Sequence, residues 1–319
     1  MTMHRAPLTR PLRCGIGALL AGAIAVAQAQ TAAPAAAQGA PAAASSPFAN
    51  ARFTQVTGHG GVPLNVVDKG DAAKPAVLFI HGFRQSTLSW SMQFASDLST
   101  RCRLVAFDLR GHGNSGAPWQ SEAYDNARPW ADDVAAVIAA LGLRKPLIVA
   151  WSFGGNVAMD FAALHPGVPV AGYLLTATAA GTLAAPAPPP NAPPRPSASP
   201  DLALNIAALE GSMRLLFPNP ALPPALRAQF AAAAMRVPPF VDRAVALRPR
   251  SSDKVAPGAP LTFVSGGRDP LVAPPIVARL KDYFPGARFV DFPDAGHATF
   301  LDEPARFNAL IDELHCGAR

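Results

Sequence analysis

Three residue types that together catalyse acyl transfer stand far apart in the chain, each shortly after an apolar segment of about five residues. They are Ser152, Asp269 and His297. A serine hydroxyl becomes an effective nucleophile when a histidine accepts its proton, and an aspartate can hold that histidine in the required tautomer and orientation. The residue types and their positions therefore predict a Ser-His-Asp triad.

The serine lies at an abrupt change of pattern. The apolar segment 147–151 ends at Ser152, and Phe153-Gly154-Gly155 then leads into the helix-compatible segment 157–164. A strand that turns sharply into a helix needs small residues there because the two backbones approach closely, and the serine is then held at the tip of a strained turn. Ala150 stands where glycine is usual, which adds one methyl group without changing the predicted role. The alternative is that Ser152 only caps a helix.

Apolar segments typical of strands alternate with helical segments along the rest of the chain. Alternation of this kind predicts an α/β fold, with a mainly parallel central sheet and helices on both faces. The first two strands have no helix between them and should form an antiparallel hairpin at one edge. The predicted strands are 52–56, 62–68, 76–80, 103–107, 147–151, 170–176, 261–265 and 288–292, and the predicted helices are 88–98, 129–141, 157–164, 202–217, 225–235, 275–283 and 303–315.

The motifs at the carboxyl ends of these strands resemble those of the α/β-hydrolase family. They follow in the family's order and spacing: His-Gly-Phe at 81–83, Asp-Leu-Arg-Gly-His-Gly-Asn-Ser at 108–115, the serine turn, Gly-Arg-Asp at 267–269 and Ala-Gly-His at 295–297. The resemblance covers essentially the whole chain outside the leader, the linker and one insertion. It implies that the backbone N–H groups of Phe83 and Phe153 form the oxyanion hole.

The resemblance also assigns other polar residues to structural tasks. It places Asp108, Arg110 and His112 in a turn and lets His81 shape the oxyanion loop. For the triad, two alternatives stay open: Asp269 could merely cap its own turn, and His297 could be an ordinary loop histidine. Asp294 is so close to His297 in sequence that it is expected to shape the turn.

The first fifty residues indicate export. Residues 1–29 combine three arginines, a short apolar stretch and an Ala-Gln-Ala end, which is typical of a secretory signal peptide. Residues 30–50 are almost entirely Ala, Pro, Gln and Ser, which predicts a disordered linker. Cleavage would lower the formal charge from +6 to +3 and leave no basic tract. We therefore expect a periplasmic or secreted protein without a stable membrane anchor and without a nucleic-acid partner.

A proline-rich insertion interrupts the alternation of strands and helices. Residues 51–180 and 256–319 are predicted to form the core, and residues 181–255 a helical cap between two core strands. A disordered Pro/Ala linker is the alternative for this insertion. The cap is expected to set specificity, with a mostly hydrophobic substrate pocket. The residues predicted to line that pocket are Trp151, Leu216, Phe217 and Phe240.

Two cysteines, Cys102 and Cys316, remain after the leader. In an exported protein an even pair suggests a disulfide, but their spacing does not distinguish a bridge from two separate thiols.

The sequence thus predicts a serine hydrolase that cleaves an ester or similar small acyl substrate by way of an acyl-enzyme. The hydrophobic pocket residues predict that this substrate is apolar. A carbon–carbon bond hydrolase or a cofactor-free perhydrolase with the same triad is the alternative, and a non-catalytic ligand-binding protein of this fold is another. Serine at position 152 argues against family members that use a carboxylate there, such as epoxide hydrolases. No His/Cys/Asp cluster has metal-ligand spacing and no Gly-rich phosphate loop opens a helix, so neither a metal nor another cofactor is expected.

Overall fold

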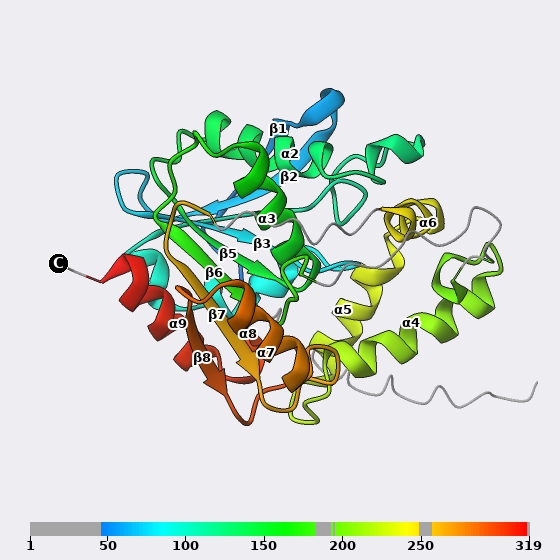
Figure 1. The fold of residues 1–319 in the computed structure, drawn as a ribbon. Helices are drawn as coiled ribbons and strands as arrows, with labels where there is room; N and C mark the ends of the chain where they lie inside the picture. Colours follow the sequence, from blue (N-terminus) through cyan, green and yellow to red (C-terminus); the bar gives the residue numbers. More distant parts are fainter. Residues whose placement is uncertain (1–45, 183–192, 194, 249–256, 318–319) are drawn as a thin grey trace, which may run out of the picture. The chain divides into compact units, whose positions relative to one another are not determined.

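The computed structural model describes residues 46–182, 193, 195–248 and 257–317. Within these residues the chain forms an eight-stranded sheet in the order β1-β2-β4-β3-β5-β6-β7-β8 (Figure 1). The strands are β1 (Arg52–Thr57), β2 (Pro63–Lys69), β3 (Ala76–Ile80), β4 (Arg103–Phe107), β5 (Leu147–Trp151), β6 (Gly172–Thr176), β7 (Leu261–Gly266) and β8 (Arg288–Phe292).

The sheet is parallel from β4 to β8, and β1 and β2 extend it at one edge as antiparallel strands. Every residue of β3, β4, β5 and β6 is buried, as expected of strands covered on both faces. The α/β-hydrolase fold predicted from the sequence, with its antiparallel hairpin at one edge, is therefore confirmed.

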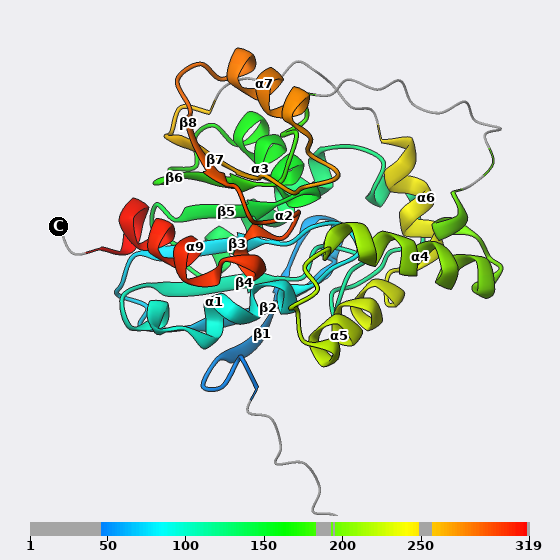
Figure 2. The same cartoon turned by 90° about the horizontal axis from the view of Figure 1, so that it is seen from below.

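Helices cover both faces of the sheet (Figures 1 and 2). The described α-helices are α1 (Ser91–Ala95), α2 (Arg128–Ala140), α3 (Phe153–Leu164), α4 (Leu202–Leu216), α5 (Pro224–Met235), α6 (Pro239–Leu247), α7 (Pro274–Tyr283), α8 (Thr299–Asp302) and α9 (Pro304–Ile311). Buried side chains of α2, α3 and α7 join one hydrophobic cluster, and those of α1, α8 and α9 join a second one. Each cluster takes alternate residues of the central strands, such as Ile148 and Val149 of β5.

Short 3₁₀ turns and one π-helical turn complete the secondary structure. They are η1 (His59–Gly61), η2 (Thr87–Trp90), η3 (Asp97–Thr100), η4 (Ser121–Ala123), η5 (Pro196–Ala198) and the π-helical η6 (Asp312–Cys316). The helix predicted at 88–98 is therefore divided among η2, α1 and η3. The helix predicted at 303–315 is observed as α9 followed by the π-helical η6. Helix α8, which Glu303 separates from α9 with φ −129° and ψ 62°, was not predicted.

The cap helices α4, α5 and α6 lie together at one side of the sheet (Figure 1). They belong to the long connection between the end of β6 at Thr176 and the start of β7 at Leu261, where the sequence predicts an insertion at 181–255. Helix α6 was not predicted. Residues 183–192, 194 and 249–255 of the predicted insertion and residue 256 of the predicted core lie outside the described residues, as do the predicted signal peptide and residues 30–45 of the predicted linker.

The end of the predicted linker differs from the expectation. Phe48 packs edge-on against Phe94, with ring centroids 5.2 Å apart, and against Phe53 at 6.1 Å. The packed part of the chain therefore begins before residue 51, because an aromatic side chain here joins the cluster on the α1 face.

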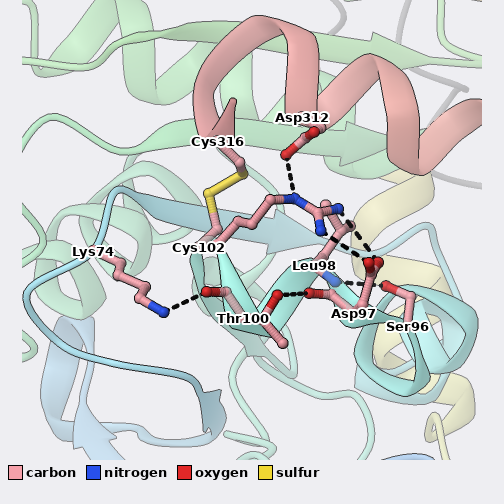
Figure 3. Close-up of a disulfide and its surroundings, with 9 residues drawn as sticks. Lys74, Ser96, Asp97, Leu98, Thr100, Cys102, Asp312 and Cys316 are labelled. Carbon is pink, nitrogen blue, oxygen red and sulfur yellow. Dashed lines mark hydrogen bonds and ion pairs between the residues drawn. A yellow bond between two sulfur atoms is a disulfide. The ribbon is translucent and has the colours of Figure 1, made fainter. Parts of the chain in front are cut away.

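Cys102 and Cys316 form a disulfide, which answers the question that the sequence leaves open (Figure 3). Cys102 directly precedes β4, Cys316 ends η6, and their Cα atoms are 5.4 Å apart. Beside the disulfide, Arg101 pairs with Asp312 at 2.7 Å and with Asp97 at 2.8 Å. The C-terminal segment is thus fastened covalently to the central sheet.

No helix in the described ranges is long and apolar enough to cross a membrane.

Candidate active site

Ser152 occupies a strained turn between β5 and α3. Its φ of 54° and ψ of −118° lie in a region that residues with a side chain rarely adopt. The turn is held by a hydrogen bond from the Ser152 N–H to the carbonyl of Thr176, at 3.0 Å. A Cβ atom at Gly154 would lie 2.5 Å from the carbonyl oxygen of Ile80, so only glycine fits there. The close approach of strand and helix explains the glycine two residues after the serine.

Asp269 and His297 meet at the carboxyl ends of β7 and β8. Nδ1 of His297 lies 3.0 Å from Oδ1 and 2.9 Å from Oδ2 of Asp269. Oδ1 also accepts the backbone N–H groups of Leu271 and Val272, at 2.8 and 3.0 Å. Asp269 therefore caps its own turn and holds the imidazole at the same time, so the two roles that the sequence left open for this residue are compatible.

The surroundings of Asp269 keep it ionised. Burial alone would raise the pKa of this carboxyl group, but the hydrogen bond and charge of His297 and the two backbone N–H groups outweigh burial and lower the pKa below its ordinary value of 3.8. An ionised carboxylate only accepts, so Nδ1 of His297 carries the proton and Nε2 of the neutral ring is left as an acceptor.

His297 lies beside the serine turn, but no hydrogen bond joins its ring to Ser152 in the described structure. Nε2 of His297 is buried without a partner among the described residues. The indole N–H of Trp151, next to the serine, donates to the carbonyl of His297 at 2.8 Å, and the two rings are 5.7 Å apart. Nucleophile–base contacts of free enzymes are often long and shorten when the substrate binds. The geometry therefore brings Asp269 and His297 into contact and places the serine turn next to them.

The predicted oxyanion donors stand at the starts of two neighbouring segments. Phe83 follows β3 and Phe153 begins α3, and their rings contact each other edge-on with centroids 5.7 Å apart. Neither backbone N–H donates to another group within the described residues. Both N–H groups are therefore available to a ligand.

His81 and His112 are buried structural groups. Nδ1 of His81 contacts the carbonyl of Gly82 at 2.7 Å, and its Nε2 accepts the N–H of Leu109 at 2.9 Å. Burial lowers the pKa of His81 to about 4 and that of His112 to about 3. Both imidazoles are therefore neutral at neutral pH, and both ring nitrogens of His81 are occupied by the turn that it shapes.

The acidic residues near these histidines are also occupied. Asp108 accepts the backbone N–H groups of Thr87 and Asn114 at 2.7 and 2.9 Å. Arg110 forms a buried two-pronged ion pair with Asp133 at 2.7 Å. These contacts place the residues in the structural turn that the resemblance implies. Asp294, by contrast, lies on the surface and pairs with Arg268 at 2.6 Å.

A cavity of about 220 Å³ opens above Ser152 between the core and the cap. Its lining contains an apolar part and a polar part: Gly82, Phe83, Arg84, Trp151, Ser152, Arg195, Ser197, Ser212, Met213, Leu215, Leu216, Asp242 and Leu271. Of the predicted pocket residues, Trp151 and Leu216 line this cavity.

Phe217 and Phe240 do not line the cavity, which corrects two of the predicted pocket residues. Phe217 is buried beneath the cap, where its ring stacks on Phe230 at 4.5 Å and contacts Trp151 at 5.9 Å. Phe240 packs against Trp119, with ring centroids 4.4 Å apart. Both side chains serve packing against other aromatic rings.

Sequence reasoning missed the polar part of the lining, above all Arg84 and Asp242. Arg84 directly follows Phe83, so its place beside the oxyanion loop was readable from the sequence. The place of Asp242 could not be predicted, because α6 was not predicted. The signal that could have drawn attention to it is an acidic residue within the mostly apolar segment 240–246. Groups of three or more His, Cys, Asp or Glu side chains suited to a metal ion are absent from the described part of the chain.

Comparisons with known proteins agree with this geometry. A solved structure described as a putative aryl esterase from Burkholderia cenocepacia superposes with a TM-score of 0.74 at 32% identity, covering 82% of this chain and 97% of that one. A bifunctional esterase/perhydrolase of Acinetobacter calcoaceticus is 37% identical over 120 residues, and epoxide hydrolase 3 of Xenopus tropicalis is 35% identical over 105 residues.

These two sequence matches are partial. They span 38% and 33% of this chain and 42% and 28% of the respective relatives. The model of the alpha/beta hydrolase family, however, matches residues 77–310, which include the serine turn, Asp269 and His297. With the fold, the strand-end motifs and this match in agreement, the chain belongs to the alpha/beta hydrolase family.

Proposed function

We propose that this protein is a serine hydrolase that cleaves carboxylic esters of small acyl groups through an acyl-enzyme. The observation that carries the proposal is the arrangement of Ser152 on its strained turn beside a His297 ring whose Nδ1 is held by Asp269 and whose Nε2 is unpaired among the described residues. This is the arrangement that a hydroxyl nucleophile requires of its base.

The chemistry follows from these positions. Ser152 Oγ attacks the ester carbonyl carbon while His297 Nε2 takes the hydroxyl proton, and Asp269 stabilises the imidazolium that forms. The N–H groups of Phe83 and Phe153 donate to the oxyanion of the tetrahedral intermediate. His297 returns the proton to the departing alcohol. A water molecule, deprotonated by the same imidazole, then releases the carboxylic acid and regenerates Ser152.

The residue at position 152 favours this chemistry over epoxide opening. Epoxide hydrolases of this family use a carboxylate at the elbow, whereas this chain has serine there. The solved structure that is described as a putative aryl esterase, at 32% identity and covering 82% of this chain, also supports an ester substrate.

Perhydrolysis is the second candidate, because the Acinetobacter relative is described as both esterase and perhydrolase. In that reaction hydrogen peroxide takes the place of water and releases the acyl group as a peracid. The two activities are separated by measuring peracid and carboxylic acid together when peroxide is added to an ester substrate.

Labelling with a fluorophosphonate probe tests the proposal directly. We expect the wild-type protein to be labelled at Ser152 and to hydrolyse 4-nitrophenyl butyrate, and the Ser152→Ala variant to lose both properties. Asp294→Asn is the matched control, because Asp294 is exposed and makes only a surface ion pair, and it should retain both. A folded wild-type protein that neither reacts with the probe nor hydrolyses activated esters would contradict the proposal and favour a ligand-binding role.

We also propose that the protein is exported. The buried disulfide between Cys102 and Cys316 supports this, since such bridges persist mainly in oxidising compartments. The prediction is that the protein recovered from the periplasm or medium begins at Gln30, which N-terminal sequencing would establish. Recovery of the uncleaved chain from the cytoplasm would argue against export.

A further inference from the structure

The turn that carries the N–H group of Phe83 has an unusual residue at its third position. The N–H of Gln85 donates to the carbonyl of Gly82 at 3.2 Å, so Phe83 and Arg84 are the two central residues of a β-turn. Arg84 has a φ of 59°. Glycine or asparagine is usual at such a left-handed position, because most other residues are strained there. The conformation of this turn is therefore not explained by the preference of its own residues.

Contacts with the cap hold Arg84 in this conformation. Its guanidinium group donates to Oδ2 of Asp242 on α6, from Nε at 3.0 Å and from Nη2 at 2.8 Å. It also donates to the carbonyl groups of Ala234 in α5 and Ser197 in η5. Arg84 is 4% exposed and Asp242 is 1% exposed, so water hardly competes for these contacts. A strained backbone conformation persists when its surroundings determine it in this way.

We propose that Asp242 is a positioning residue for the oxyanion hole. By holding Arg84 in the left-handed conformation, it keeps the N–H of Phe83 in place for the carbonyl oxygen of the substrate. Without this anchor the turn can relax to the form with a right-handed third residue. That change flips the peptide bond between Phe83 and Arg84 and displaces the donor. The inference rests on the proposed hydrolase function and adds that the docked cap supports catalysis as well as the shape of the cavity.

Two substitutions of Arg84 separate the backbone of the turn from the docking of the cap. Arg84→Gly and Arg84→Ala remove the same guanidinium contacts, but only glycine adopts a φ of 59° without strain. We expect kcat for 4-nitrophenyl butyrate to be higher in Arg84→Gly than in Arg84→Ala by roughly fivefold or more, the factor that corresponds to the strain of a left-handed residue. Equal kcat values in the two folded variants would overturn the inference.

Substitutions of Asp242 test the anchor itself through kcat, KM and the inhibition constant of 1,1,1-trifluorohexan-2-one. The tetrahedral adduct of this ketone with Ser152 places an oxyanion in the hole, so its affinity reports on the donors. In Asp242→Ala we expect kcat to fall by roughly 10- to 100-fold, less than the complete loss of a donor, with little change in KM. The affinity for the ketone should fall by a similar factor.

Asp242→Asn keeps an oxygen that accepts from the guanidinium group, so its kcat should lie between those of Asp242→Ala and the wild type. If the pair only docks the cap, KM should rise in both variants while kcat and the affinity for the ketone stay unchanged. That outcome would overturn the inference and leave the proposed hydrolase function intact.

Asp68→Ala is the matched control, because it also removes a buried carboxylate that is paired with an arginine. Asp68 lies on β2, is 6% exposed and accepts from Nε and Nη2 of Arg103 at 3.0 and 2.9 Å. Its kcat should equal that of the wild type. A fall as large as that of Asp242→Ala would assign the effect to general loosening of the fold and overturn the inference. If the wild-type protein hydrolyses no ester, the proposed function fails, and this inference fails with it.

Discussion

Replacing Asp269 by asparagine changes the protonation of His297 while nearly preserving shape. Oδ1 of Asp269 accepts the N–H groups of Leu271 and Val272 at 2.8 and 3.0 Å. These backbone groups only donate, so the amide oxygen of Asp269→Asn has to take the Oδ1 position. The NH2 group then takes the Oδ2 position, which lies 2.9 Å from Nδ1 of His297.

The amide NH2 group donates, so Nδ1 of His297 becomes the acceptor and the proton of the neutral ring moves to Nε2. Nε2 is the atom that has to receive the hydroxyl proton of Ser152, so the base is held in the wrong tautomer. The corresponding change in serine proteases lowers kcat by about 10⁴-fold. At about 1.36 kcal/mol per tenfold, this is about 5.4 kcal/mol of transition-state stabilisation. We expect a loss of that order here.

The assay is kcat for 4-nitrophenyl butyrate at pH 7.5, with circular dichroism to show that the variant is folded. Asp294→Asn makes the same chemical change three residues before His297, but on an exposed carboxylate paired with Arg268, and should leave kcat unchanged. A folded Asp269→Asn variant whose kcat stays within about tenfold of the wild type would refute the proposed role of this carboxylate.

Three further predictions concern stability. Burial would raise the pKa of Asp269, but its hydrogen bonds lower the pKa below 3.8, so the ionised carboxylate stabilises the fold above its unfolded pKa. This stabilisation is lost as the pH falls through the lowered pKa. Calorimetry below about pH 4 should therefore show a smaller fall of Tm for Asp269→Asn than for the wild type. The double substitution Cys102→Ser and Cys316→Ser removes the disulfide, which closes a loop over 214 positions, and should lower the free energy of unfolding by about 2–5 kcal/mol. Urea titration measures this change, and an unchanged midpoint of unfolding would show that the bridge adds no stability. Gly154→Ala places a Cβ atom 2.5 Å from a carbonyl oxygen at the end of β3, so it should lower the free energy of unfolding by about 1–3 kcal/mol and abolish most of the esterase activity. Gly167→Ala is the control, because no atom lies within 4 Å of the added Cβ atom, and it should change neither stability nor activity.

The central sheet could be predicted closely because its signals are local. The bounds of β3, β4, β5 and β8 agree with the predicted segments 76–80, 103–107, 147–151 and 288–292. Each is a five-residue apolar or alternating run with turn-forming residues on both sides. Helix α6 was missed because it is only nine residues long and begins at the second of two consecutive prolines in a proline-rich region, so its composition indicated a loop.

Side chains at the strand ends could be predicted for a related reason. The turn after β5 requires a glycine two residues after Ser152. The pleat and register of the parallel strands bring the segments after β5, β7 and β8 to the same edge of the sheet. The approach of Asp269 to His297 follows from that topology, and no long-range packing detail is needed.

The cap offers no such constraint on the directions of its side chains. Leu216 is the last residue of α4, whereas Phe217 leaves the helix with φ −129° and ψ 65°, so the two side chains face different surroundings. Leu216 lines the cavity and Phe217 stacks on Phe230, and hydrophobicity alone does not distinguish the two positions. The direction depends on how the cap docks, and the docking includes a contact between Arg84 and Asp242, which are 158 positions apart. Arg84 and Asp242 both line the cavity, so this part of its lining arises only when the cap docks on the core. The sequence therefore predicts the class of reaction better than it predicts which ester is chosen.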